Sequence, residues 1–175
     1  MNVKEAIEKR FSTRGFKEEK VNESDIEEIL LAGLHAPTAC NKQEIHFTVV
    51  KGEAPILKEV EDEKNRMRNI VSPAHNSYYE APVLILLSAE EAFNWSKVDA
   101  GIAVQSMALR AEELGLGSLI IGSIYDAMNG EKKEYFAKEF DFPSGYEFVI
   151  SIAIGYTETS KQPHTIDKEA NVNYK

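Results

Sequence analysis

Apolar residues recur every three to four positions in several stretches of the chain, which is the pattern of amphipathic helices. Val3, Ala6 and Ile7 follow this spacing and predict a short helix near the amino terminus. A second helix is predicted over residues 26–34, and the segment Ser24-Asp25-Ile26-Glu27 has the form of a capping box at its start. These two helices enclose a short polar turn.

Three later stretches also predict helices. Residues 98–114 show the clearest periodicity, and they contain Ala and Gly residues that allow close approach of a neighbouring element. A charged helix is predicted over residues 131–140. Residues 55–79 are charged and only weakly periodic, which predicts one or two helices with a mobile connection.

Apolar stretches predict four strands. Residues 82–88 and 147–155 are almost wholly apolar, which is typical of strands that are buried on both faces. Shorter strands are predicted over residues 45–50 and 118–122. Because helices and strands alternate without regular β-α-β units, we expect an α+β fold with a mixed, mostly antiparallel sheet flanked by helices.

The chain has 175 residues, which fits a single domain over residues 1–175. Residues 156–175 are polar and show little periodicity. A tail of this kind is either disordered or docks on a surface outside its own core.

Composition narrows the class of protein. The formal net charge of −9 argues against a nucleic-acid partner, because that binding depends on clustered Lys and Arg. The single cysteine, Cys40, excludes an internal disulfide and fits a reducing compartment. No signal-peptide pattern and no apolar run of membrane length is present, so we expect a soluble, cytoplasmic protein without a membrane partner.

The polar turn after the first helix has a chemistry of its own. Arg10 and Arg14 lie within five residues of each other, together with Ser12 and Thr13. A guanidinium group binds phosphate through two parallel hydrogen bonds, and a hydroxyl adds a neutral hydrogen bond. The turn therefore predicts an anion clamp, with an ordinary solvated basic turn as the alternative. Neither a G-x-G-x-x-G segment after a strand nor a P-loop sequence is present.

Five short segments occur in a specific order along the chain. They are Arg10-Phe11-Ser12-Thr13-Arg14, Ala36-Pro37-Thr38-Ala39-Cys40-Asn41-Lys42-Gln43, Tyr79-Glu80-Ala81-Pro82-Val83, Asp99-Ala100-Gly101-Ile102-Ala103 leading into Leu114-Gly115-Leu116-Gly117, and Ile154-Gly155-Tyr156. In this order and spacing the chain resembles the FMN-dependent nitroreductase family over nearly its whole length. The resemblance implies an intertwined homodimer with FMN at the subunit interface, in which the tail of residues 156–175 reaches over the partner subunit.

The resemblance also implies which residues bind FMN. These are Arg10, Phe11, Ser12, Arg14, Pro37, Thr38, Asn41, Gln43, Ile121, Gly122, Ser123, Lys161 and His164. The residues of the polar turn would bind the phosphate, the ribityl chain and the pyrimidine edge, where positive charge raises the flavin reduction potential. Asn41 and Gln43 would bond the ring carbonyl and ribityl groups, and the backbone at Gly122 would face N5. Lys161 and His164 are candidates for a further phosphate contact.

The activity implied by the resemblance is that of an NAD(P)H oxidoreductase. Hydride from NADH or NADPH would pass through flavin N5 to an electron-poor acceptor such as a nitroaromatic or a quinone, with ping-pong kinetics and no catalytic side chain. Three alternatives stay open: a specialised family member in flavin breakdown or dehalogenation, a flavin-binding module with little turnover, and a scaffold that binds no FMN.

The chain departs from the family pattern in three ways. The chain is short, and the region between the middle strands and helices that builds the substrate wall in larger members is reduced, which leaves the substrate open. The family commonly has Pro and an aromatic residue after the segment 41–43, where this chain has Glu44 and Ile45. The family often places Lys and Arg close together in the tail, whereas two residues separate Lys161 from His164 here.

Other polar residues receive simpler interpretations. Cys40 has no adjacent base, so we do not expect a catalytic thiol. The four histidines show no metal-ligand spacing, and no metal is expected. Asp99 and Glu112 are interpreted as members of a solvated helix face.

Overall fold

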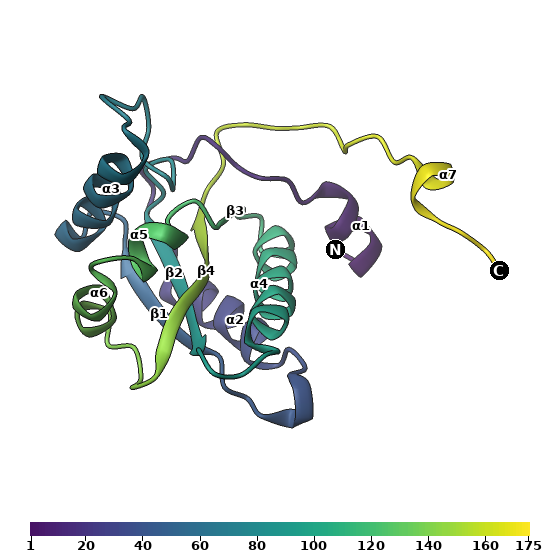
Figure 1. Ribbon diagram of the computed structural model, residues 1–175. Helices are drawn as coiled ribbons and strands as arrows, with labels where there is room; N and C mark the ends of the chain where they lie inside the picture. Colours follow the sequence, from purple (N-terminus) through teal and green to yellow (C-terminus); the bar gives the residue numbers. More distant parts are fainter.

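One antiparallel sheet of four strands runs through the centre of the protein in the order β1-β2-β4-β3 (Figure 1). The structure is a computed structural model that describes residues 1–175. The strands are β1 (His46–Lys51), β2 (Val83–Glu90), β3 (Gly117–Ile121) and β4 (Tyr146–Gly155). All three strand pairs are antiparallel, which corrects the expectation of a mixed sheet. The single parallel contact is an isolated bridge between Ser12 and Ser118, because residues 10–14 follow β3 only briefly.

The two central strands are those with continuous apolar sequences. Every β2 residue from Val83 to Ala89 is buried. Leu84 and Leu86 belong to one core cluster, and the alternating residues Ile85 and Leu87 belong to a second cluster on the opposite face. The prediction that these strands are buried on both faces is confirmed.

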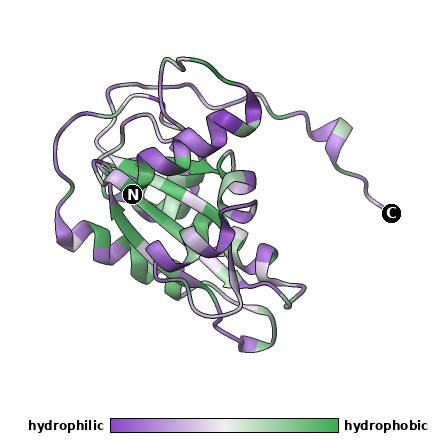
Figure 2. Cartoon of the chain, turned by 60° about the vertical axis from the view of Figure 1, so that its left-hand side comes forward, coloured by the Kyte–Doolittle hydropathy of each residue, from purple (hydrophilic) through white to green (hydrophobic).

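Helices cover both faces of the sheet. They are α1 (Val3–Lys9), α2 (Glu23–Leu34), the 3-10 helix η1 (Ala39–Asn41), α3 (Pro55–Arg68), α4 (Ser96–Glu113), α5 (Tyr125–Asn129), α6 (Lys133–Glu139) and α7 (Lys168–Asn171). Helices α2 and α4 contribute to the core on one face, and α3, α5 and α6 contribute to the core on the other. Figure 2 shows apolar residues gathered on the strands and polar residues on the outer helix faces. No helix is both long enough and apolar enough to span a bilayer.

The predicted capping box at the start of α2 is wrong. The helix begins one residue before Ser24, so the Ser24 side chain already lies inside the first turn. Asn22 precedes the helix, and its amide donates to the Asp25 carboxylate at 3.2 Å. A reciprocal capping box is present on α1 instead, where Asn2 accepts from the Glu5 N–H at 3.0 Å and the Glu5 carboxylate accepts from the Asn2 N–H at 3.4 Å.

The remaining helices differ in how well the pattern predicts them. α4 and α6 match the predictions to within two residues at each end, and residues 55–79 contain one helix, α3. Helix α5 is not predicted from the sequence. It has five residues and depends on a tertiary contact, because the Asn129 side chain donates to the Phe148 carbonyl at 2.8 Å and accepts from its N–H at 3.2 Å.

The carboxy-terminal tail leaves the sheet at the end of β4 and extends away from the body of the protein (Figure 1). At its start, the N–H of Lys17 donates to the Tyr156 carbonyl and the N–H of Glu158 donates to the Gly15 carbonyl, both at 2.9 Å. All residues from Glu158 onward are exposed. Docking of this tail on a partner subunit stays a prediction.

Candidate functional site

Residues 10–14 leave the end of α1 and run beside the free edge of β3. The N–H of Thr13 donates to the carbonyl of Ser118 at 2.9 Å, and Thr13 is completely buried. Gly117 allows this close approach, because a Cβ atom at that position would lie 2.6 Å from the Thr13 hydroxyl oxygen. The turn is therefore fixed at its centre, with Arg10 and Arg14 on either side.

Arg10 and Arg14 are the two arginines of the chain that form no ion pair. The other three, Arg66, Arg68 and Arg110, each lie within 4.0 Å of a carboxylate. Two unpaired guanidinium groups on one turn produce a local positive potential in a protein whose formal net charge is −9. This arrangement favours an anionic ligand with phosphate or carboxylate geometry.

Two buried polar atoms in the turn have no hydrogen-bond partner, namely Nε of Arg10 and Oγ1 of Thr13. Most buried polar atoms in proteins are paired, so an unpaired donor nitrogen on the Arg10 guanidinium is a place where an acceptor from a ligand would fit. Burial raises the pKa of Glu112, and the positive charges of Lys9 and Arg10 act in the opposite direction. The field of Arg10 thus reaches the carboxy-terminal end of α4.

The other end of β3 presents an open stretch of backbone. Ile121 is buried, Gly122 is exposed and Ser123 is half-buried. A Cβ atom on Gly122 would meet only Cδ1 of Ile150, at 3.4 Å, so the packing of the chain itself does not require a glycine there. Absence of a side chain lets a ligand approach the backbone closely. Gly122 lies four residues from Ser118, about 13 Å along the strand.

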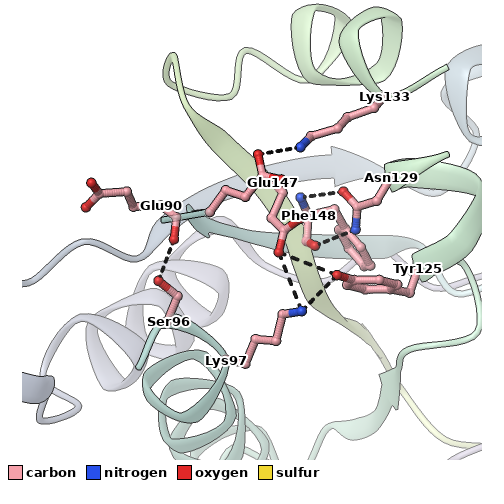
Figure 3. Close-up of polar contacts among 9 residues, drawn as sticks. Glu90, Ser96, Lys97, Tyr125, Asn129, Lys133, Glu147 and Phe148 are labelled. Carbon is pink, nitrogen blue, oxygen red and sulfur yellow. Dashed lines mark hydrogen bonds and ion pairs between the residues drawn. The ribbon is translucent and has the colours of Figure 1, made fainter. Parts of the chain in front are cut away.

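Side chains from α4 and β4 fix the turn that follows Gly122 (Figure 3). The N–H of Tyr125 donates to the Gly122 carbonyl at 3.0 Å. The Tyr125 hydroxyl accepts from Nζ of Lys97 at 3.0 Å and donates to Oε1 of Glu147 at 3.4 Å. The hydrogen bond to Tyr125 is the main cause that raises the pKa of Lys97, which keeps this amine charged.

A second polar segment, residues 38–43, lies between α2 and β1. The N–H of Ala39 donates to Oδ2 of Asp99 at 2.9 Å, and the N–H of Gln43 donates to the Thr38 hydroxyl at 2.9 Å. The Gln43 amide also donates to Oδ1 of Asn41 at 3.0 Å. The predicted polar pair of Asn41 and Gln43 is therefore adjacent in space.

The backbone of this segment is unusual. Cys40, Asn41 and Gln43 have φ angles of 56°, 53° and 52°. Residues other than glycine seldom adopt this left-handed backbone conformation, and residues that do so cluster at ligand sites. Asn41 and Gln43 are exposed, as is Pro37 beyond the end of α2, so this segment is open to a ligand or a second molecule.

Within one copy of the chain, residues 10–14 and residues 38–43 lie at opposite ends of α4 (Figure 1). Asp99, near the start of α4, holds the second segment, whereas Glu112, near its end, lies in the field of Arg10. These two positions are 13 residues apart, or about 20 Å at 1.5 Å per residue. A single copy does not bring the two polar segments together.

Lys161 and His164 lie in the exposed tail and form no ion pair or side-chain hydrogen bond with the rest of the chain. The structure does not bring them to the polar turn. Their contact with a phosphate stays a prediction.

Asp99 corrects the interpretation of α4 acids as a solvated face. Its exposed fraction is 3%, and its carboxylate accepts from a backbone 60 residues away in the chain. The available sequence signal is its place beside small residues in Asp99-Ala100-Gly101, since small residues mark closely packed helix faces. Ser118 also has a role that sequence reasoning did not assign, because its carbonyl accepts from the N–H of Thr13. The Thr13 hydroxyl, predicted as part of the anion clamp, is instead buried against Gly117.

Comparisons with known proteins show which family the chain matches. The sequence model described as the nitroreductase family matches residues 7–156. A Methanothermobacter thermautotrophicus protein with the provisional name NADH dehydrogenase/NAD(P)H nitroreductase is 29% identical over 150 residues, covering 82% of this chain and 73% of that protein.

Solved structures share the fold over the full length. A nitroreductase from Desulfitobacterium hafniense with bound FMN has a TM-score of 0.86 and 30% identity, covering 99% of this chain and 98% of that chain. A nitroreductase from Bacteroides fragilis with bound FMN has a TM-score of 0.88 and 24% identity, and the match covers 100% of both chains.

Proposed function

Because the chain belongs to the nitroreductase family, we propose that it is an FMN-dependent NAD(P)H oxidoreductase that acts as a homodimer. The observation that carries this proposal is the pair of unpaired arginines, Arg10 and Arg14, beside the free edge of β3. An acidic protein that leaves two guanidinium groups without partners on one turn has a positive site for an anionic cofactor.

The residues along β3 suit the parts of FMN. Arg10, Ser12 and Arg14 would hold the phosphate, ribityl chain and pyrimidine edge, and the buried Arg10 Nε without a partner supports this fit. Gly122 would face the ring at the other end of the strand, where the backbone is exposed and no side chain intervenes. The phosphate end and the ring end of the site thus lie on one edge of the sheet.

A second copy of the chain would complete the site. Asn41 and Gln43 lie in the segment held at the Asp99 end of α4 and Arg10 acts at its Glu112 end, positions about 20 Å apart along the helix, so contact of both with the same ligand would call for a partner subunit. Exposed apolar residues on α2, on α4 and at the position directly before α4 support such an interface. They are Leu31, Leu34, Trp95, Val98 and Ile102.

The chemistry divides between cofactor and chain. When bound, FMN supplies hydride transfer between NADH or NADPH and an electron-poor acceptor such as a nitroaromatic or a quinone. Arg10 and Arg14 would place positive charge beside the cofactor, which would favour its negatively charged form and raise its reduction potential. The turn after Gly122 is fixed by Tyr125 and Lys97 and would hold the open backbone in place beside the ring. No side chain has to act as a nucleophile.

Titration of the protein with FMN, followed by quenching of flavin fluorescence, tests the assignment. Loss of one charged hydrogen-bond donor costs about 1.5–3 kcal/mol, so Arg14→Ala should weaken FMN binding by about 10- to 150-fold. Arg14→Lys keeps the charge without the planar fork and should give an intermediate loss.

Arg68→Ala is the matched control, because Arg68 is also an exposed arginine but pairs with Asp126 at 3.6 Å. It should bind FMN as the unaltered chain does. Equal FMN affinity in Arg14→Ala and Arg68→Ala would contradict the proposed phosphate site.

A further inference from the structure

Trp95 is the only tryptophan of the chain and lies directly before α4. Its exposed fraction is 55%, and its indole ring forms neither an aromatic pair nor a hydrogen bond within the chain. Tryptophan is highly buried on average in folded proteins, because its large ring gains much from leaving water. An indole without a partner therefore marks a place where another molecule is expected to pack.

Two contacts place Trp95 beside the polar segment 38–43. Two residues before Trp95, the centre of the Phe93 ring lies 4.1 Å from Nζ of Lys42, which belongs to that segment. Four residues after Trp95, the Asp99 carboxylate accepts from a backbone N–H of the same segment at 2.9 Å. Asp99 follows Trp95 by about one helical turn, or about 6 Å along the axis of α4. Contacts with segment 38–43 therefore lie on both sides of Trp95 in the chain.

The backbone around Trp95 is fixed by its neighbour Ser96. The Ser96 hydroxyl donates to the Glu90 carbonyl at 2.7 Å (Figure 3), and the N–H of Ser96 donates to the Phe93 carbonyl at 3.1 Å. Ser96 itself is buried. A flat side chain on a fixed backbone loses little conformational freedom when it binds a ligand, because only its two side-chain torsions remain free.

Trp95 continues an exposed apolar face of α4. Val98 and Ile102 follow it by three and seven residues, which places all three on one side of the helix, and both are exposed. This side belongs to the proposed interface between two copies, and Trp95 lies at the end of it nearest to residues 38–43. In the proposed dimer, residues 38–43 of one copy meet FMN bound to the other copy, so the indole would reach the same FMN site.

We propose that Trp95 is a specificity-determining residue, whose indole face stacks on the ring of a planar, conjugated acceptor at the FMN site between two copies. Electron-poor rings, such as those of quinones and nitroaromatics, complement the electron-rich face of an indole in offset stacking. Polar groups on such a ring would meet the exposed amides of Asn41 and Gln43. The inference rests on the proposed function, and it names planar rings as the preferred class among electron-poor acceptors.

Steady-state kinetics of the FMN-loaded, full-length protein with two acceptors test the assignment. Naphthoquinone can stack on an indole, whereas ferricyanide is an octahedral ion that cannot. Trp95→Leu keeps an apolar side chain but removes the ring, so it should lower the ratio of kcat/KM for naphthoquinone to kcat/KM for ferricyanide by about 2- to 12-fold. A changed flavin potential affects both acceptors and largely cancels in this ratio. Trp95→Phe keeps an aromatic ring and should lower the ratio less than Trp95→Leu does.

Tyr135→Leu is the matched control, because Tyr135 is an exposed aromatic residue on α6, and it should leave the ratio unchanged. An unchanged ratio in Trp95→Leu would overturn the inference. If that result came with a shift from dimer toward monomer in sedimentation, Trp95 would belong to the contact between the subunits instead.

Fluorescence of the single tryptophan gives a second readout that requires no turnover. Dinitrobenzene is an electron-poor aromatic ring that quenches indole emission on contact. Without a reductant, it should quench Trp95 along a saturable curve. Quenching that rises linearly without saturation would show collision alone and would overturn the inference. A protein that retains no FMN would refute the proposed function, and the shape of the quenching curve would still decide whether Trp95 binds an aromatic ring.

Discussion

Substitution of Gly117 by alanine is predicted to displace the polar turn from β3. A Cβ atom on Gly117 would lie 2.6 Å from Oγ1 and 3.0 Å from Cγ2 of Thr13, and 3.1 Å from Cβ of Thr157. Thr13 cannot rotate away, because its side chain is completely buried and branched at Cβ. The new methyl group therefore has to push apart β3 and the turn that holds Arg10 and Arg14.

The magnitude follows from these distances. Extra atoms in a closely packed site cost about 1–3 kcal/mol, and replacing glycine by alanine recovers about 0.4–1 kcal/mol by restricting the unfolded chain. We expect Gly117→Ala to lower the free energy of unfolding by about 1–2 kcal/mol. FMN affinity should fall as well, because the displaced segment carries the proposed phosphate donors.

Urea unfolding followed by far-UV circular dichroism measures the stability change, with Gly122→Ala as control. Thr13→Ala removes both clashing atoms, so the double variant Thr13→Ala/Gly117→Ala should be more stable than the sum of the single effects predicts. If Gly117→Ala is as stable as Gly122→Ala, or if the two substitutions at residues 13 and 117 are additive, the turn is not held against β3 in this way.

Three further outcomes are expected. Gly122→Ala should change the free energy of unfolding by less than about 0.5 kcal/mol, because its Cβ atom meets only one atom, at 3.4 Å. It should nevertheless slow the reduction of bound FMN by NAD(P)H, measured by stopped-flow absorbance. An unchanged rate would show that Gly122 does not belong to the site. Truncation after Ser160 should preserve the circular dichroism spectrum, because residues 161–175 are exposed. In sedimentation, the truncated protein should shift from dimer toward monomer. A dimer that is unaltered by the truncation would exclude a role of the tail in assembly. Lys64→Met should lower the free energy of unfolding in urea by about 3–5 kcal/mol, because it leaves the buried Glu61 carboxylate without the Lys64 amine 2.7 Å away. Exposed ion pairs contribute about 1 kcal/mol or less, so a loss below about 1 kcal/mol would show that this pair is solvated.

The elements that the sequence predicts well are those whose pattern depends on burial alone. Strands β2 and β4 are continuously apolar because both faces are covered, and α4 is long enough for its periodicity to be clear. The start of α2 is not predicted correctly, because Ser24 and Asn22 are both residues that favour a helix start and only the backbone decides between them. Helix α5 is too short for periodicity and depends on Asn129 binding β4.

The candidate site also contains some residues that the sequence pattern identifies and others that it does not. Arg10, Ser12 and Arg14 stand out from the sequence because they are close together in the chain and differ from its acidic average. Asp99 does not stand out, because its role arises from a contact between α4 and a segment some 60 residues earlier. A local pattern carries no information about that contact, and an acid on a helix is ordinarily solvated.

The central claim is that this chain binds FMN and passes electrons from NAD(P)H through it. The most direct test is the visible absorption spectrum of the full-length protein, incubated with FMN and freed of unbound flavin, before and after addition of NADH or NADPH without oxygen. We expect a bound-flavin spectrum that bleaches with at least one of the two nucleotides and returns when a quinone or nitroaromatic acceptor is added. A protein that retains no flavin, or whose bound flavin neither nucleotide reduces, would contradict the proposed function.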